Sequence, residues 1–223
     1  MKIYIRAAIK NTSDEDDDVR CFVASDPDTR PASLAELAGD YDDDVRTAVA
    51  DNPNTPPDTL AMLATDPDWR IRERAMLNPN MPLDVLSAAV EEGDRWDMEL
   101  VAANPSTPAE LLQQLYDLAY GTYIEVDILP RLAKNPNTPI DILEKISNSQ
   151  TANTLCHLAE NSNITPEIAE KLAFYPNSML VRLAAIENPN TSNEILHMLE
   201  VNDNSRDVRE KARIALQRRG VDV

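Results

Sequence analysis

One short phrase returns along this chain at nearly constant intervals. Its clearest copy is Asn52-Pro53-Asn54-Thr55-Pro56. The first proline of the phrase, replaced once by Ser162, stands at positions 27, 53, 79, 105, 136, 162 and 189, so the steps are 26, 26, 26, 31, 26 and 27 residues. A fixed period in this range is typical of a solenoid, in which each unit contacts only its neighbours. The repeat therefore predicts one elongated domain over residues 1–223.

The ends of this domain differ from its middle. We expect residues 1–24 to form an N-terminal cap and a partial repeat, residues 25–200 to form the repeats, and residues 201–223 to form the last helix and a C-terminal cap. Terminal units of a repeat array are usually atypical because one of their faces is solvated.

The unit over residues 51–76 shows what each copy encodes. Asn52 precedes a proline, which favours an extended backbone that ends the previous helix. We expect Thr55 to be the N-cap of a first helix, with Pro56 at the first helical position and Asp58 completing a capping box. The turn at residues 65–68 then leads to a second helix that begins near Trp69.

The other units repeat the same apolar pattern. First helices carry pairs such as Leu34 and Leu37, and second helices carry pairs such as Val45 and Val49. Such short helices are unstable alone and need stacking neighbours. The fold class predicted is all-α, a right-handed helical-repeat solenoid (an α-α superhelix) of about seven to eight two-helix units.

The phrase, followed by Leu-x-x-Leu-Ala, an acidic turn and Val-Arg, resembles the leucine-rich repeat variant family, which is similar in style to HEAT and armadillo arrays. The resemblance covers residues 14 to 215 and implies short 3₁₀ and α helices in alternation. Because the period here is slightly longer, the first helix could be a full α-helix. The cysteine cluster that binds an iron–sulfur centre in a member of that family is missing, so no cofactor is predicted.

Charge limits the possible partners. The net charge is −18, from 39 acidic and 21 basic residues. Nucleic-acid affinity depends on Lys and Arg contacts to phosphate, and anionic membranes also attract cationic segments, so neither is predicted as a partner. A basic protein partner is favoured. With no secretory signal and no apolar run of roughly 18 residues, the cytoplasm is the expected location, and a monomer the expected state.

Aromatic and acidic residues gather near the turns between first and second helices. The aromatic ones include Trp69, Trp96, Tyr120 and Tyr123, and the acidic ones include Asp43, Asp68, Asp94, Glu92 and Asp97. Acids beside aromatic rings suit Lys and Arg through ion pairs and cation–π contacts. The partner-binding site predicted is therefore Trp69, Trp96, Tyr120, Tyr123, Asp43, Asp68 and Asp94. The structural alternative is that the acids cap second helices while the aromatics cover helix ends.

Two irregularities interrupt the array. The 31-residue step adds five residues around residues 115–123, which form either a longer helix pair with packed tyrosines or a protruding recognition loop. Arginine follows Val or Ile at Arg20, Arg46, Arg72, Arg182 and Arg209, and we expect it to pair with Asp in the adjacent turn. Met98, Leu129 and Leu155 replace it in the central units, where they could make the second-helix surface more apolar and form a contact site.

Catalytic and metal-binding patterns are not found. His157 and His197 lie in different units without ligand spacing, and the Asp runs lack the glycine and glutamate of a calcium loop. Cys156 beside His157 points away from it along a helix. We therefore predict no catalytic residues, no metal and no cofactor.

The function predicted is a non-catalytic protein–protein interaction scaffold that binds a basic partner through an acidic, aromatic edge. One alternative is an inhibitor or immunity-type protein that neutralises a basic enzyme such as a nuclease. A second alternative is a cofactor-handling helper or an enzyme.

Overall fold

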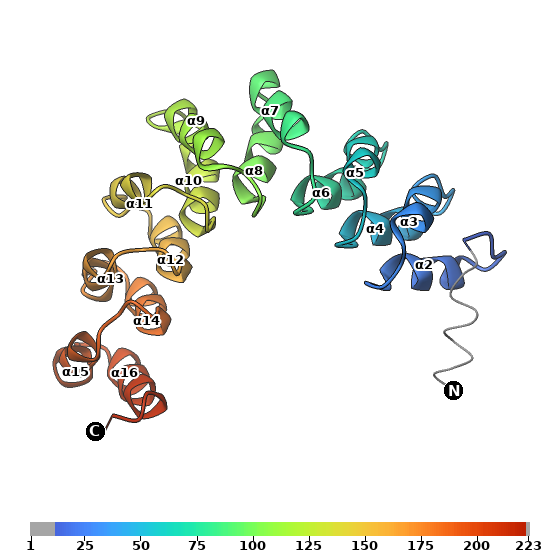
Figure 1. The fold of residues 1–223 in the computed structure, drawn as a ribbon. Coiled ribbons are helices and arrows are strands. Elements are labelled where there is room, and N and C mark those ends of the chain that lie inside the picture. The colour runs from blue at the N-terminus through green and yellow to red at the C-terminus, as the bar shows by residue number, and fades with distance from the viewer. Residues whose placement is uncertain (1–11, 222–223) are drawn as a thin grey trace. The chain divides into compact units, whose positions relative to one another are not determined.

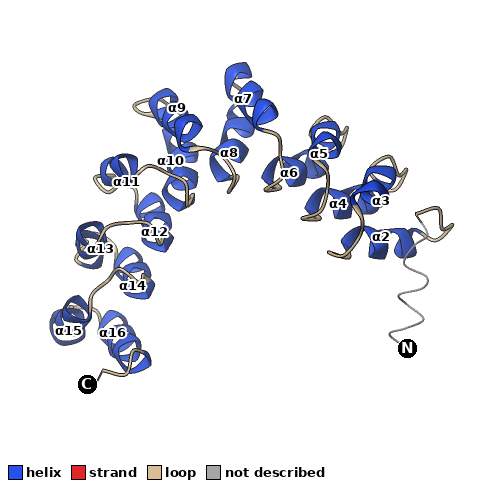
Figure 2. Ribbon diagram, viewed as in Figure 1, coloured by secondary structure: helices blue, strands red, loops and turns tan. Residues whose placement is uncertain are grey.

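The computed structural model describes residues 12–221. Over these residues the chain forms fifteen α-helices and no strand (Figures 1 and 2). The helices belong to two compact units, which divide between Thr107 and Pro108. The all-α prediction is confirmed, and the cap predicted for residues 1–24 lies partly outside the described residues.

Each unit is a series of two-helix repeats. Unit 1 contains α2 (Asp17–Ser25), α3 (Pro31–Leu37), α4 (Asp43–Asp51), α5 (Pro57–Leu63), α6 (Trp69–Leu77), α7 (Leu83–Glu92) and α8 (Arg95–Ala103). Unit 2 contains α9 (Ala109–Ala119), α10 (Glu125–Lys134), α11 (Ile140–Ile146), α12 (Ala152–Glu160), α13 (Pro166–Ala173), α14 (Met179–Glu187), α15 (Asn193–Asn202) and α16 (Arg206–Arg218). Odd-numbered helices are the first helices of the repeats and even-numbered helices the second, which confirms the helical-repeat prediction.

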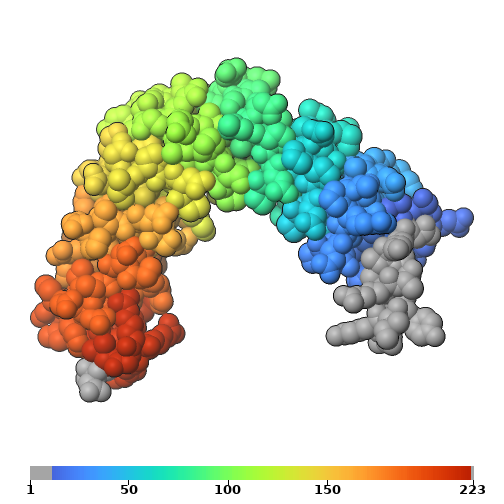
Figure 3. Space-filling model, viewed as in Figure 1, coloured from blue at the N-terminus to red at the C-terminus, as the bar shows by residue number. Residues whose placement is uncertain are grey.

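Second helices form a row within each unit. In unit 1, α2, α4, α6 and α8 contact one another in series, and in unit 2, α10, α12, α14 and α16 do the same. Each first helix contacts the second helix of its own repeat, so two rows are visible in each unit of Figure 1. Figure 3 shows side chains filling the space between neighbouring repeats in each unit. That the two units act as one domain stays a prediction.

The core is built from the predicted apolar pairs. Leu34, Leu37, Leu60 and Leu63 are almost fully buried on first helices of unit 1, as are Val45 and Val49 on a second helix. The first helices run for seven to eleven residues and are α-helical rather than 3₁₀. Each repeat thus buries one short apolar stripe per helix, and neighbouring repeats complete the core.

The predicted cap of the first helix is wrong by one residue, and the reason is chemical. Pro56 is the N-cap of α5 and Pro57 its first residue, with no side-chain cap hydrogen bond. Thr55 is fully buried, and its hydroxyl donates to the carbonyl of Val49 at 2.5 Å, back toward the preceding helix. Thr29, Thr107, Thr138 and Thr191 donate in the same way. These threonines therefore donate a hydrogen bond to the end of the preceding helix and do not cap the start of the next one.

A buried ladder of asparagine side chains links successive repeats. The side-chain amide of each donates to two backbone carbonyls of the preceding repeat at 2.6–3.0 Å, as recorded for Asn52, Asn78, Asn104, Asn161 and Asn188. One of these two acceptors is the carbonyl of the residue that holds the same position in the preceding repeat. The side-chain oxygen accepts the backbone N–H two residues later, such as Asn80 N–H for Asn78. We call this series the asparagine ladder.

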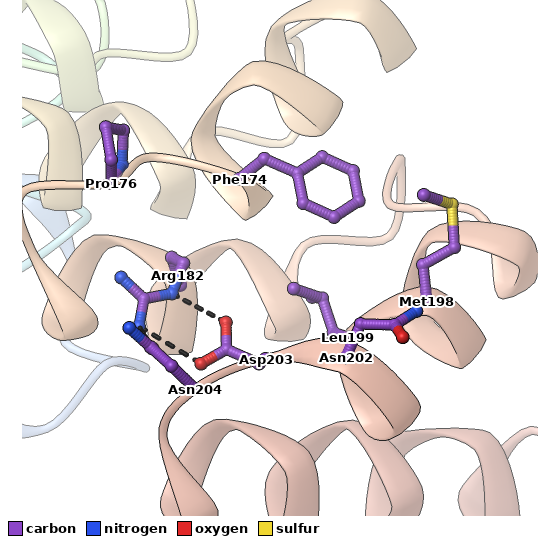
Figure 4. Close-up of a pocket in the computed structure, with 8 residues that line it drawn as sticks. All are labelled: Phe174, Pro176, Arg182, Met198, Leu199, Asn202, Asp203 and Asn204. Atoms are coloured by element: carbon purple, nitrogen blue, oxygen red, sulfur yellow. Dashed lines mark hydrogen bonds and ion pairs between the residues drawn. The ribbon is translucent and has the colours of Figure 1, made fainter.

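An arginine–aspartate ladder runs along the turns, and the predicted pairing is confirmed for Arg20, Arg46 and Arg182, whereas the contacts given for Arg72 and Arg209 are with backbone carbonyls of their own turns. Arg20 binds both carboxylate oxygens of Asp40, Arg46 binds Asp66, and Arg182 binds Asp203 (Figure 4). The nearest nitrogen–oxygen distances are 2.6, 2.8 and 2.7 Å. Each guanidinium also donates to a backbone carbonyl of its own turn; Arg20, for example, donates to the carbonyl of Asp14. Arginine thus ties the turn of its own repeat to the turn of the next.

The central interruption of the arginine column does not create an apolar surface. Met98, Leu129 and Leu155 are all buried, at 6%, 4% and 0% exposure. The three side chains therefore do not form an exposed apolar surface, although Leu129 lines a cavity in unit 2. A side chain shorter than arginine does not reach the turn and instead packs into the core.

Replacing one ladder asparagine tests how strongly the ladder holds neighbouring repeats. Asn78→Ala removes two buried donors and leaves the carbonyls of Ala50 and Asn52 without them. We expect the free energy of unfolding in urea to fall by about 2–4 kcal/mol. Asn80→Ala is the matched control, because Asn80 also donates to the preceding repeat but is exposed, and should cost below about 1 kcal/mol. Similar losses in both variants would contradict the dominance of the buried ladder.

The Arg20–Asp40 pair predicts a pH dependence of stability. Burial alone would raise the pKa of Asp40, but hydrogen bonds from Arg20 and from the Asp42 N–H hold it below its ordinary value of 3.8. The pair therefore contributes fully above pH 3.8 and is lost as the pH falls through the lower folded value. We expect Asp40→Asn to cost about 3 kcal/mol at neutral pH and to reduce the acid sensitivity of unfolding. Asp43→Asn, which breaks an exposed pair, should do neither.

Candidate functional site

Two of the predicted aromatic residues lie together on unit 1. Trp69 begins α6 and Trp96 lies in the first turn of α8. Their rings meet edge to face, with centroids 6.3 Å apart and an interplanar angle of 78°. The side chains remain 54% and 46% exposed. Since large aromatic side chains in mutual contact form a continuous apolar patch, this pair is a candidate contact surface.

The three predicted acids already have partners within unit 1. Asp68 caps α6 by accepting the Arg70 N–H, and Asp94 caps α8 by accepting the N–H groups of Trp96 and Asp97. Hydrogen bonds from Arg70 lower the pKa of Asp68 to about 2. Arg70 also forms an exposed ion pair with Asp43 at 3.0 Å. The capping alternative is therefore confirmed for Asp68 and Asp94.

A different set of acids lines a cavity of about 360 Å³ in unit 1. Asp84 and Glu92 reach it from α7, and Asp97 from the first turn of α8. Its floor is apolar and made largely of small residues on α5 and α7: Ala61, Ala64, Val85, Ala88 and Ala89. The lining thus combines three carboxylates with small apolar side chains. We refer to these two features of unit 1 together, the pair Trp69 and Trp96 and the acids Asp84, Glu92 and Asp97, as the tryptophan–carboxylate surface.

The electrostatics of this cavity favour a cation. Burial raises the pKa of Asp97 above its ordinary value, and the charges of Asp94 and Glu92 raise it further, against the lowering effect of Arg72. A carboxylate whose negative charge is disfavoured by burial and by like charges gains most from a bound positive group. No group of three or more His, Cys, Asp or Glu in residues 12–221 has the spacing to hold a metal ion.

The predicted tyrosines belong to unit 2. The five-residue insertion lengthens α9 to eleven residues, and Tyr116 and Tyr120 on its last turns stack with centroids 5.4 Å apart. Tyr116 is buried, which supports the longer-helix alternative for this segment. Tyr123 lies in the short connection to α10 and is 82% exposed. Tyr120 and Tyr123 thus belong to unit 2, whereas Trp69 and Trp96 belong to unit 1.

A further cavity of about 340 Å³ lies in unit 2 among α13, α14 and α15. Figure 4 shows Phe174 and Met198 on one side of it and the Arg182–Asp203 pair on another. The charges on its wall are paired with each other, since both carboxylate oxygens of Asp203 accept from Arg182. This cavity therefore offers chiefly an apolar contact.

Sequence reasoning found the tryptophans and the acidic turns but missed Asp84 and the alanine floor. Asp84 lies in the first turn of α7, where an acid has an ordinary role near the helix dipole. The signal that could have shown the cavity is the set of alanines on two neighbouring first helices, Ala61 on α5 with Ala88 and Ala89 on α7. Across residues 12–221, no helix combines the length and apolarity needed to cross a membrane.

Comparison with known proteins identifies one repeat directly. The family model described as leucine rich repeat variant matches residues 43–68, which contain α4, the asparagine phrase and α5. A solved structure titled "a leucine-rich repeat variant with a novel repetitive protein structural motif" is similar, with 21% sequence identity and a TM-score of 0.49, covering 96% of this chain and 83% of that chain. None of the curated proteins compared matches this chain. Residues 43–68 thus match the leucine-rich repeat variant family, which the recurring phrase resembles, and the other repeats carry the same helix pair.

Proposed function

We propose that this chain is a non-catalytic scaffold that binds a basic segment of another protein on the tryptophan–carboxylate surface of unit 1. Helical-repeat arrays present extended surfaces whose backbone is already satisfied by internal hydrogen bonds, so binding depends on side chains. The binding of proteins in general follows from this architecture. The basic character of the partner is the finer part of the proposal.

The observations that carry the proposal are an exposed tryptophan pair and an acid-lined cavity in the same unit, each of which includes a residue from the first turn of α8. Trp96 and Asp97 are consecutive residues in its first turn. A Lys or Arg side chain can lay its alkyl stem on the alanine floor, place its charge near Glu92 or Asp97, and leave neighbouring residues against the tryptophan rings. The net charge of −18 would draw a basic segment toward the surface and repel acidic ones.

The other predictions of function have no comparable support. No contact described above favours an inhibitor of a basic enzyme or a cofactor-handling helper over a scaffold. The single-copy state and the cytoplasmic location stay predictions.

Tryptophan fluorescence offers a direct test, because Trp69 and Trp96 are the two tryptophans of the chain. We expect a lysine- and arginine-containing peptide to change the emission at low salt, and a peptide of the same length with Glu in place of each basic residue to leave it unchanged. Raising the salt should weaken the effect, because exposed ion pairs are screened. Equal responses to the basic and the acidic peptide would contradict the proposal.

Alanine variants measured by calorimetry locate the binding. Trp69→Ala and Trp96→Ala should each weaken binding of the basic peptide by about tenfold or more, as is usual for exposed aromatic anchors. Phe22→Ala is the matched control, since Phe22 is an exposed aromatic of unit 1 on α2, outside the tryptophan–carboxylate surface. If the control weakens binding as much as either tryptophan variant, the peptide does not bind at the proposed place.

Asp97 should show opposite effects on stability and on binding. Its pKa is raised in the folded state, so its ionised form opposes folding above pH 3.8, and the opposition is full above the raised folded value. We expect Asp97→Asn to raise the free energy of unfolding at pH 7 by roughly 0.5 kcal/mol. The effect is small because solvent screens the charge of a partly exposed carboxylate. The same variant should bind the basic peptide several times more weakly. A variant that loses both stability and binding would show that Asp97 is merely structural.

A further inference from the structure

The two irregularities of the repeat array meet around one cavity in unit 2. This cavity, of about 340 Å³, lies among α9, α10, α11 and the turn that follows α11. Leu129 on its wall stands where other repeats carry the ladder arginine. Tyr116 and Tyr120 also line it, and they come from the end of α9 that the insertion lengthens, with Tyr120 as its C-cap. The function proposed for unit 1 uses none of these residues.

The chain itself shows how this fold holds a guanidinium group. Arg20 donates to both oxygens of Asp40 and to the carbonyl of Asp14, and its guanidinium lies 4.7 Å from the centre of the Tyr41 ring. A carboxylate, a carbonyl and an aromatic face together satisfy the planar, donor-rich arginine head. Asp40 follows Arg20 by twenty residues, as Asp66 follows Arg46.

The cavity of unit 2 lacks this internal ion pair but has a carboxylate and aromatic rings from other positions of the repeat. Leu129 takes the arginine position, and Ser149, twenty residues later, takes the aspartate position; both line the cavity. Glu125 provides a carboxylate at its edge, with one oxygen accepting the Gly121 N–H at 2.8 Å. Tyr116 and Tyr120 provide stacked ring faces. The cavity thus combines an acid and aromatic rings at a place where this chain supplies no arginine of its own.

Lys145 shows that the tyrosine wall attracts positive charge. Its ammonium nitrogen lies 5.3 Å from the centre of the Tyr116 ring, within the range of a cation–π contact. Lys145 also pairs with Asp141 at 3.3 Å, and its side chain is 50% exposed. It can therefore move away from the ring toward Asp141 and solvent when another cation arrives.

We propose that this cavity binds an arginine side chain of a partner protein, which takes the place that ladder arginines hold in other repeats. The guanidinium would lie against Tyr116 or Tyr120 and pair with Glu125, while its stem contacts Leu129. The volume is within the range of sites that hold small groups. This inference concerns unit 2 alone, so it stands or fails separately from the tryptophan–carboxylate surface.

The test uses the full chain and a short blocked peptide with one arginine between alanines and glycines. The tyrosine-ring NMR signals of Tyr116 and Tyr120 should shift on titration, with a dissociation constant of roughly 1–10 mM, as expected for one side chain. The matched peptide has citrulline, which keeps the shape of arginine without its charge, and should bind about tenfold more weakly. No shift with arginine, or an equal shift with citrulline, would overturn the proposal.

Three variants exclude other occupants. Glu125→Gln should weaken binding of the arginine peptide several-fold. Lys145→Gln should strengthen it by removing a competing cation, whereas a cavity built for a carboxylate would lose its ligand in that variant. The double variant with Leu129→Arg and Ser149→Asp restores the internal ion pair and should abolish binding of the arginine peptide. Its urea unfolding midpoint should equal or exceed that of the wild type. If Lys145→Gln abolishes binding, or the double variant remains folded and binds as the wild type does, the proposal is wrong.

Discussion

The structure of each unit depends on the buried asparagine amide that joins one repeat to the next. A two-helix repeat of this length cannot bury enough apolar surface by itself, and its second helix ends with carbonyls that need donors. Asn78 supplies two such donors at once, to the carbonyls of Ala50 and Asn52. Because one acceptor belongs to the previous asparagine, the same geometry can be repeated indefinitely. A buried amide is costly unless its hydrogen bonds are all made, so the ladder fixes the spacing between neighbouring repeats.

The other positions of the phrase complete this junction. Threonine closes the preceding helix through its hydroxyl, and the second asparagine reaches back to the preceding repeat at the surface, as Asn80 does to the carbonyl of Pro53. At the last repeat, Arg219 performs the same task with a guanidinium, donating to the carbonyls of Thr191 and Asn188. The chemistry of the donor can therefore change while the need for it remains. The polar groups of the backbone are satisfied from within each unit, which leaves the turn edge free to vary.

Much of the fold could be predicted because its signals are local and periodic. The helix pairs, their buried leucines and the Arg20–Asp40 type of ion pair all follow from spacing within one repeat. The role of asparagine was missed because its partners lie 26 and 28 residues earlier, and because Asn before proline has a sufficient local explanation as a helix end. A clue was present in the sequence: Asn161 is kept where the following proline is replaced by Ser162. A residue needed only to end a helix would not have to keep its amide there.

The candidate site was less predictable, since it depends on a cavity between neighbouring repeats rather than on the type of any one residue. Asp68 and Asp94 resemble Asp97 in sequence, yet they cap helices while Asp97 lines a cavity. What separates them is the small size of the alanines on α5 and α7, a property of two neighbouring repeats together. Leu129 is likewise important for its position rather than for its apolar character, because it replaces a ladder arginine and lines a cavity. In a stack held by ladders, replacing arginine with Leu129 and aspartate with Ser149 removes an internal ion pair, and both new residues line a cavity. Departures from the repeat therefore change what the surface can bind without changing how the repeats are joined.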